Sequence, residues 1–291
     1  MAVYQTKGEK AFSIFNVIFL GAFALLCLFP FMHVIAQSLS SHRAIVSGEV
    51  IFFPIEITFH AYKEVFMDAH FINSFIVSVA RTVVGTFFNV FFTCLMAYPL
   101  SKTYIKGRGL ILFLIVFTML FNGGMIPTYL VVRETGLLNS FWVYIIPSLI
   151  SAFNLIIVKN FFQSVPAELE ESAKIDGASN IRILFRIVIP LSMPVIATIG
   201  LFHAVFHWNS FFDAVIYISD RNLYPLQVYL RELIQFDQSD ISLRDNFEQQ
   251  LLATESLKAA ALIASTVPIL IVYPFLQKYF VKGVMLGSVK G

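Results

Sequence analysis

The chain has 291 residues, of which 58% are hydrophobic and only 13% are charged, and its formal net charge is +2. Soluble globular domains carry about 25% charged residues. The composition therefore excludes an ordinary soluble domain and indicates a membrane protein, for which we expect a lipid bilayer as surroundings and no nucleic acid as partner.

Two further features limit the chemistry of the chain. Cys27 and Cys94 lie inside apolar runs without the neighbours of a reactive thiol, so neither a disulfide framework nor a cysteine metal site is indicated. The stretch Gly107–Gly109 lacks the Gly-Lys-Ser/Thr ending of a phosphate-binding loop. Any energy from ATP would have to come from another polypeptide.

Six stretches are long and apolar enough to be transmembrane helices, which need about 20 such residues. The fifth qualifies if Arg186 lies at its entrance. The first is too long for the apolar part of a signal peptide and is followed by five more, so we expect it in the mature protein. The predicted fold is all-α, one transmembrane domain over 1–291 with spans at 12–36, 70–100, 109–132, 140–162, 183–207 and 258–280.

The distribution of Lys and Arg predicts the orientation of these spans. Twelve of them fall on the side that holds both termini and the loops near 101–108 and 159–186, and seven fall on the other side. Positive charge is enriched in cytoplasmic loops. Both termini and the 163–182 loop are therefore predicted to be cytoplasmic, and the loops near 37–69 and 213–257 external.

Spans two and three each contain an unusual feature. Arg81 lies about 11 residues into span two, roughly 16 Å along the helix, where a charge is costly and normally faces the bundle interior. Arg81 fits a polar cavity or an ion pair at a subunit interface, or else a side chain that snorkels to the membrane surface or has a purely structural partner. Span three is interrupted at Asn122-Gly123-Gly124, with Pro127 beyond, and broken backbone at that depth lies against protein or water.

The loop after span four has strong helix and turn signals. Pro166 suits a first helical turn, and the carboxylates that follow complement the positive end of the helix dipole. Asp176-Gly177 supplies a turn, and Ser179 can cap a second helix that continues into span five. We predict two short helices joined at a glycine corner, with Pro190 and Pro194 bending the second.

Span five carries His203 and His207 on one face, four residues apart. No third ligand is evident, so we expect two hydrogen-bonded imidazoles rather than a metal site. Trp208 follows at the outer end, where a Trp suits an interface anchor. In the external loop, leucines at helical spacing from Leu226 predict a surface helix, followed by a flexible acidic segment that is solvated or contacts a partner.

The loop after span four also carries a motif. Glu171-Ser172-Ala173, three residues, Gly177, nine residues and Ile187-Val188-Ile189-Pro190 resemble the EAA motif of the permeases of binding-protein-dependent ABC importers. Ser172 and Ile189 are its two mild departures. Other segments resemble the carbohydrate-uptake branch of this family, and within it the subgroup for oligosaccharides from complex polysaccharides: 97–102, 121–132, 207–217, 224–232 and 277–291.

The resemblance implies the type I ABC importer permease fold, with the 163–182 loop as a cytoplasmic coupling helix that docks on an ATPase subunit. It implies as partners a second permease, two ATPases that bind ATP and Mg, and an extracytoplasmic sugar-binding protein contacted by 219–250. The chain itself would bind no cofactor and catalyse nothing, in the bacterial cytoplasmic membrane. The docking residues expected are Glu168, Glu171, Ser172, Ala173, Asp176, Gly177, Ala178 and Pro190.

Polar positions within or beside the spans are candidates for the sugar pathway. An interhelical hydrogen bond would explain Asn154 equally well, and glycine packing would explain the break near Asn122. An ion-coupled transporter would need carboxylates at the membrane midplane, and an intramembrane enzyme a nucleophile with a base; we find neither. The pathway candidates are Arg81, Asn122, Tyr129, Asn154, Trp208, Asn209 and Asp213.

Overall fold

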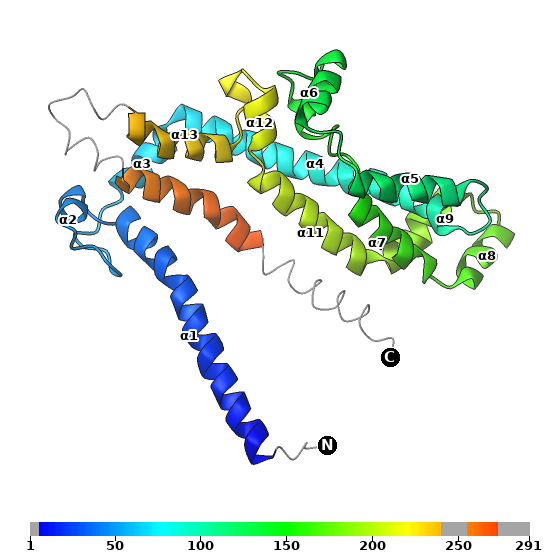
Figure 1. Cartoon of the computed structure of the whole chain (residues 1–291), viewed down its shortest axis with the longest axis horizontal. Helices are drawn as coiled ribbons and strands as arrows, with labels where there is room; N and C mark the ends of the chain where they lie inside the picture. The colour runs from blue at the N-terminus through cyan, green and yellow to red at the C-terminus, as the bar shows by residue number, and fades with distance from the viewer. Residues whose placement is uncertain (1–5, 240–254, 273–291) are drawn as a thin grey trace. The chain divides into compact units, whose positions relative to one another are not determined.

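The computed structural model describes residues 6–239 and 255–272, and every regular element in these ranges is helical (Figure 1). The described residues fall into two compact units. Unit 1 lies within Met1–Ala69 and Leu230–Val267, and unit 2 lies within His70–Tyr229 and Pro268–Gly291. The predicted all-helical fold is confirmed for the described residues.

Unit 1 is dominated by the helix α1 (Lys7–Ser38). Thr6 and Glu9 form a capping box at its start, which satisfies backbone N–H groups that have no partner within the helix. Side chains from Lys7 to Met32 are exposed, and from Phe12 onward nearly all of them are apolar, on every face of the helix. A helix that is apolar on every face suits a lipid environment.

The last turn of α1 packs on a small folded segment of the same unit. This segment contains α2 (His42–Val46) and leads to α3 (His60–Met67). Its core is Ala36, Ala44 and Val50. In unit 1, two hydrogen bonds through Ser40 join the helix end to the extended stretch before α3, which fixes the loop that was predicted near 37–69.

Unit 2 is built on α4 (Ala69–Ser101), which matches the predicted span 70–100. Many of its buried residues are small or polar and recur three or four positions apart, so they form one stripe along the helix. Two hydrophobic clusters pack against α4, one around Tyr144 and Ile218 and the other around Leu155 and Ile199. The polar stripe is Ser74, Ser78, Arg81, Gly85, Asn89 and Thr93.

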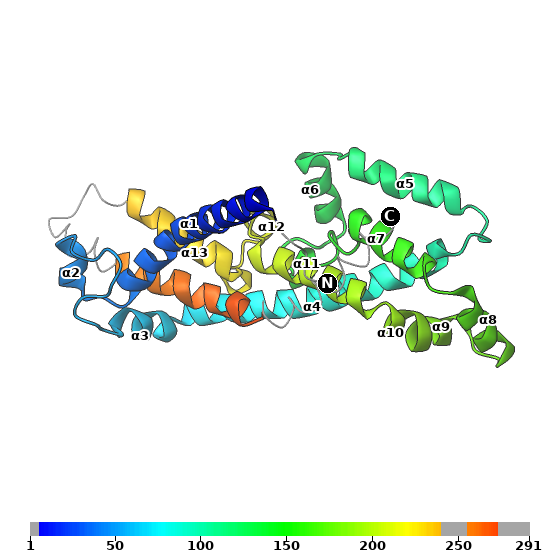
Figure 2. The same ribbon diagram turned by 90° about the horizontal axis from the view of Figure 1, so that it is seen from below.

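The predicted break in span three is present. Helix α5 (Arg108–Leu120) ends just before the Asn-Gly-Gly stretch, and α6 (Met125–Glu134) begins just after it. The two helices differ in direction by 118° (Figure 2). Gly124 has φ = 90°, a conformation that residues with a side chain rarely adopt.

The stretch 140–162 differs from the continuous helix that its composition predicts. It consists of the 3₁₀ turn η1 (Phe141–Tyr144), an irregular segment and α7 (Ala152–Gln163). Pro147 has no backbone N–H to donate and disfavours helix in the residue before it. The Ser151 hydroxyl then accepts from the Asn154 backbone N–H at 3.4 Å, so the helix starts only there.

After α7 the chain forms short helices before it becomes a long helix again. These are α8 (Ala167–Ile175), α9 (Asn180–Ile183), the π-helical turn η2 (Leu184–Val188), α10 (Ile189–Leu191) and α11 (Met193–Asn209). The segment Asn180–Leu191 and α11 are bent by 86°, as the two prolines predict. Three further elements follow: α12 (Phe212–Tyr217), η3 (Arg221–Leu223) and α13 (Leu226–Ser239).

Within the described residues, three helices are long and apolar enough to cross a membrane: α1, α4 and Glu255–Val272. Counting each bent pair as one span raises the number to five. The six-span topology and the single-domain organisation therefore stay predictions. Part of the sixth predicted span, 273–280, and the acidic segment 240–254 lie outside the described residues.

Candidate functional sites on α8 and α4

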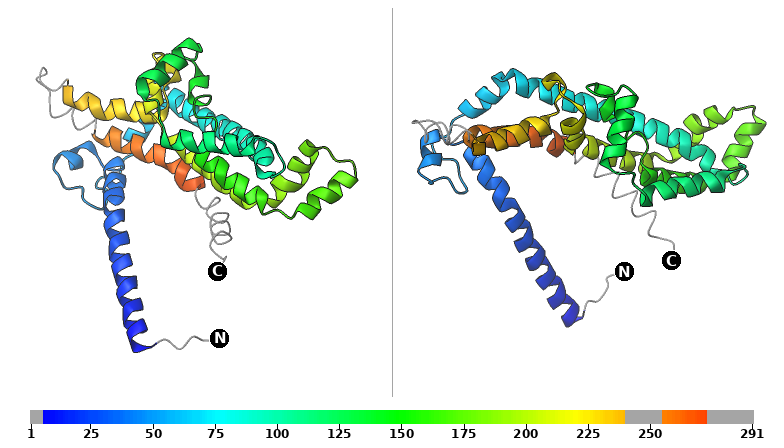
Figure 3. Two further views of the ribbon diagram at one scale, coloured as in Figure 1. Left: turned by 45° about the vertical axis from the view of Figure 1, so that its right-hand side comes forward. Right: turned by 45° about the horizontal axis from the view of Figure 1, so that its top comes forward.

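The helix pair α8 and α9 forms a compact hairpin, drawn in yellow-green in Figure 3. Pro166 stands at the N-cap of α8, one position before the first helical turn in which it was predicted. Gly177 has φ = 78°, and its N–H donates to the Lys174 carbonyl at 3.0 Å, which ends α8 in a glycine turn. Ser179 caps α9 by accepting from the Arg182 backbone N–H at 3.4 Å. The predicted helix, glycine corner and second helix are confirmed.

The residues of the motif divide between two faces of this hairpin. Ala173 and Ala178 point inward and pack against the hydrophobic cluster that contains Ala97 and Leu100 at the end of α4. The other face is exposed and combines carboxylates with apolar side chains, of which Ile175 is 87% exposed. The exposed predicted residues are Glu168, Glu171, Ser172, Asp176, Gly177 and, farther along, Pro190.

A third carboxylate of α8 behaves differently from its neighbours. Glu170 is buried, with 5% of its surface exposed. Its Oε1 accepts from the Lys102 ammonium at 2.5 Å, and its Oε2 accepts from the Tyr98 hydroxyl at 3.3 Å. The motif pattern does not single out Glu170, although this residue precedes the inward Ala173 by three positions and so shares its helical face.

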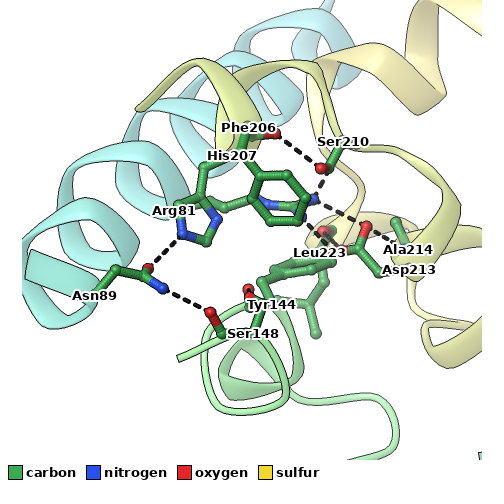
Figure 4. A network of polar contacts seen from close by, with 10 residues as sticks. All are labelled: Arg81, Asn89, Tyr144, Ser148, Phe206, His207, Ser210, Asp213, Ala214 and Leu223. Atoms are coloured by element: carbon green, nitrogen blue, oxygen red, sulfur yellow. Dashed lines mark hydrogen bonds and ion pairs between the residues drawn. The ribbon is translucent and has the colours of Figure 1, made fainter. Parts of the chain in front are cut away.

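At the other end of unit 2, the α4 stripe carries a second buried ion pair (Figure 4). The Arg81 guanidinium is fully buried, and its two terminal nitrogens donate hydrogen bonds to the two oxygens of the Asp213 carboxylate. It also donates to the Ser210 carbonyl at 3.1 Å and lies 4.4 Å from the centre of the Tyr144 ring. Two predicted pathway residues thus satisfy each other within one chain.

A hydrogen-bonded group continues the stripe beyond Arg81 (Figure 4). The His207 ring nitrogen Nε2 lies 2.8 Å from the Asn89 side-chain oxygen, and the Asn89 amide donates to the Ser148 carbonyl at 2.6 Å. Gly85 lies directly under the His207 ring, since a Cβ at Gly85 would overlap the ring atoms. These contacts join α4, α11 and the irregular segment before α7.

The remaining candidates in α7 and α11 also have identified surroundings. The Asn154 amide nitrogen lies 3.0 Å from His203 Nε2, so of the two interpretations of Asn154 the interhelical hydrogen bond is present. Trp208 is 7% exposed and meets the Phe75 ring edge-on at 6.1 Å. Asn209 is exposed, and its amide donates back to the Val205 carbonyl at 2.9 Å.

The two candidates near the α5–α6 break do not join the Arg81 group. Asn122 is exposed and accepts from the Gly124 backbone N–H at 2.9 Å, which stabilises the break. Tyr129 on α6 stacks against Tyr217 on α12, with ring centres 6.1 Å apart. Burial, and then the nearby Asp213 carboxylate, raise the pKa of the Tyr217 phenol above its ordinary value, so it stays neutral at physiological pH.

The described residues contain no group of three or more His, Cys, Asp and Glu side chains placed to hold a metal ion. The structure has two other features. The α8–α9 hairpin has an exposed face, and the polar stripe of α4 is hydrogen-bonded to later parts of the chain. The hairpin presents an exposed surface to a partner, whereas the buried stripe holds distant segments of unit 2 together.

The sequence of the chain is similar to that of known proteins. Residues 71–286 match the family described as "Binding-protein-dependent transport system inner membrane component". Protein LplC of Bacillus subtilis is 47% identical over 289 residues, which cover 99% of this chain and 98% of LplC. The polygalacturonan/rhamnogalacturonan transport system permease protein YtcP of Bacillus subtilis is 48% identical over 279 residues, covering 94% of this chain and 96% of YtcP.

A solved structure agrees with these relatives. One chain of a bacterial ABC transporter involved in the import of the acidic polysaccharide alginate superposes on this chain with a TM-score of 0.88. It is 38% identical in sequence, and the match covers 95% of this chain and 99% of that one. The described architecture is therefore that of a solved permease.

Proposed function

The chain belongs to the family of inner-membrane components of binding-protein-dependent transport systems, and from this membership we propose how its two polar regions divide the work of transport. It is the non-catalytic permease subunit of an ABC importer for oligosaccharides or polysaccharide fragments. Membership of this family argues against the ion-coupled alternative.

In our proposal the α8–α9 hairpin faces the cytoplasm and docks on an ATPase subunit. The observation that carries it is the division of the motif: its alanines pack inward, while Glu168, Glu171 and Ile175 stand exposed. A mixture of apolar and charged groups on a rigid, protruding hairpin suits a protein partner. Gly177 gives the corner its shape, because its φ of 78° is open to few other residues.

The assembly that we propose contains this chain, a second related permease, two cytoplasmic ATPases and an extracytoplasmic binding protein. ATP and Mg²⁺ bind in the ATPases, and this chain binds no cofactor. Both termini lie in the cytoplasm in this orientation. The loop that includes α13 then faces outward, where its partly exposed helix supports a contact with the binding protein.

We propose that the transported solute is an acidic oligosaccharide. YtcP is named for polygalacturonan and rhamnogalacturonan, and the solved relative takes part in import of an acidic polysaccharide. The stacked Tyr129 and Tyr217 offer a ring surface and hydroxyls that can donate to sugar oxygens or carboxylates. Asn122 and Asn209 are exposed amides, which can also bond sugar oxygens. The other candidates are buried or half-buried, so in our proposal they pack beside the pathway: Arg81, Asp213, Asn154 and Trp208.

The proposed assembly is tested by purifying the tagged chain from native membranes in mild detergent. We expect two ATPase subunits and a second permease to co-purify, and ATP hydrolysis to rise when the binding protein and an oligogalacturonide are added. Stimulation by a neutral oligosaccharide alone would contradict the acidic substrate. A chain that purifies alone and transports with an ion gradient would contradict the assembly.

The docking role is tested by the substitution Gly177→Leu, with Gly136→Leu as a matched control. Both glycines have positive φ, 78° and 70°, and a Cβ added at either one would meet no neighbouring atom within 4 Å, so the backbone strain is similar. We expect only Gly177→Leu to lose ATPase association. Equal association of the two variants with the ATPases would remove the docking role.

A further inference from the structure

We propose that Glu170 is a positioning residue that fastens α8 to the end of α4, so that a displacement of α8 moves α4 with it. This inference rests on the proposed docking of α8 to an ATPase and adds the link by which movement passes into the membrane helices. The contacts that carry it are those between Glu170, Lys102 and Tyr98.

The link between Lys102 and Glu170 is largely shielded from water. The side chains of Lys102 and Glu170 are 15% and 7% exposed, so water screens the pair far less than it screens a surface ion pair. The Lys102 ammonium also lies 4.8 Å from the centre of the Tyr98 ring. One carboxylate on α8 thus contacts the last turn of α4 and the residue just beyond its end.

A second contact holds the same two segments together. The Lys174 ammonium on α8 lies 5.6 Å from the centre of the Tyr104 ring, in the turn that follows α4. Arg108 in turn donates from Nε to the Leu100 carbonyl at 2.7 Å, which closes that turn on the helix end. The turn between α4 and α5 is therefore fixed to α4 and in contact with α8.

The inward alanines by themselves supply a weaker link. Ala173 and Ala178 are small and only partly buried against the cluster, and apolar contact of this kind allows sliding. A charged hydrogen bond has a direction, and separating it leaves a buried charge without a partner. Glu170 therefore resists both sliding and separation of α8 from α4, which a surface carboxylate such as Glu171 cannot do.

The experiment uses the complete transporter reconstituted in liposomes, and it measures sugar transported per ATP hydrolysed. The variants are Glu170→Gln, Lys102→Met and the exchanged pair Lys102→Glu with Glu170→Lys. Lys106→Met is the matched control, because Lys106 is exposed in the same turn. We expect each single variant to keep its ATPases and its basal hydrolysis, while transport per ATP falls about fivefold.

The exchanged pair separates transmission from simple folding. It restores opposite charges at the same two positions, so we expect it to recover at least half of the transport lost in Glu170→Gln. Unchanged transport per ATP in Glu170→Gln would overturn the proposal. So would loss of ATPases from the purified Glu170→Gln complex in proportion to the loss of transport, since Glu170 would then act on docking.

Failure of the positioning role of Glu170 is distinguishable from failure of the proposed docking of α8. If the wild-type chain does not bind ATPases, the docking of α8 is wrong. If the wild-type chain binds them and transports, and Glu170→Gln behaves in the same way, only the positioning role of Glu170 is wrong.

Discussion

Helix α4 holds a buried cation near its middle, and a partly exposed cation follows just beyond its end. Each is paired with a carboxylate from a later part of the chain. Arg81 pairs with Asp213, and Lys102 pairs with Glu170. The two cations are separated by about 32 Å along the helix at 1.5 Å per residue. That distance is close to the thickness of the hydrocarbon core of a bilayer, about 30 Å.

The two pairs differ in their surroundings. Arg81 is fully buried and has a carboxylate, a carbonyl and an aromatic ring as partners, all from packed segments of unit 2. Lys102 is partly exposed, and its carboxylate comes from a short hairpin that protrudes beside the helix end. Two ion pairs of similar chemistry thus differ in role: Arg81 and Asp213 form a fixed junction, and Lys102 and Glu170 form, in our proposal, a transmitting contact.

The largest expected effect is on the fixed junction. Replacing Asp213 with Asn leaves the Arg81 guanidinium buried without a counter-charge, and we expect a loss of about 3 kcal/mol in the free energy of unfolding. Thermal unfolding in detergent measures it. Glu134→Gln is the control, because its ion pair with Arg133 is exposed and contributes little. Equal stability of the two variants would show that Asp213 does not hold Arg81.

A second effect tests the packing beside that junction. Gly85→Ala places a Cβ into the His207 ring, which has to move and break its hydrogen bond to Asn89. We expect a loss of about 2 kcal/mol in stability. Gly109→Ala on α5 has open space around it and is expected to be neutral or slightly stabilising, because Ala favours helix more than Gly does. A Gly85→Ala protein as stable as Gly109→Ala would contradict the close approach of α11 to α4.

The transmitting contact is expected to give a smaller loss of stability. Lys102→Met removes a cation that is partly exposed, and the Glu170 carboxylate keeps its hydrogen bond from the Tyr98 hydroxyl, so we expect about 1 kcal/mol, less than for Asp213→Asn. The same unfolding experiment compares the two variants. A larger loss for Lys102→Met than for Asp213→Asn would reverse the comparison and make the α4 end the structural anchor.

The smallest effect on stability is expected on the outer face of α8. Ile175 is 87% exposed, so Ile175→Ser should leave the unfolding temperature unchanged. If that face docks on an ATPase, the variant nevertheless binds the ATPases less tightly, as measured by co-purification. Wild-type binding would show that the apolar part of the face is not used.

Much of the chain could be predicted from local patterns. The break at Gly124, the hairpin around Gly177 and the bend between α10 and α11 all follow from glycines, prolines and caps within a few residues. The irregular segment before α7 could not be predicted from composition, because its apolar residues fit a membrane helix. Only Pro147, which disfavours helix, and Ser151, which caps α7, indicate otherwise. The stripe through Gly85 and Asn89 shows the four-residue spacing that could have drawn attention to it.

By itself, the sequence determined that the chain is a helical membrane protein, where its backbone turns, and that it carries the motif of a transport family. Only the tertiary structure decided that Arg81 meets Asp213, 132 residues away, and that Glu170 rather than Glu171 is the buried carboxylate, bound to Lys102 at a separation of 68 residues. The reason is physical: neighbours along the chain limit the backbone conformation, whereas the partner of a buried charge depends on which distant segments pack together.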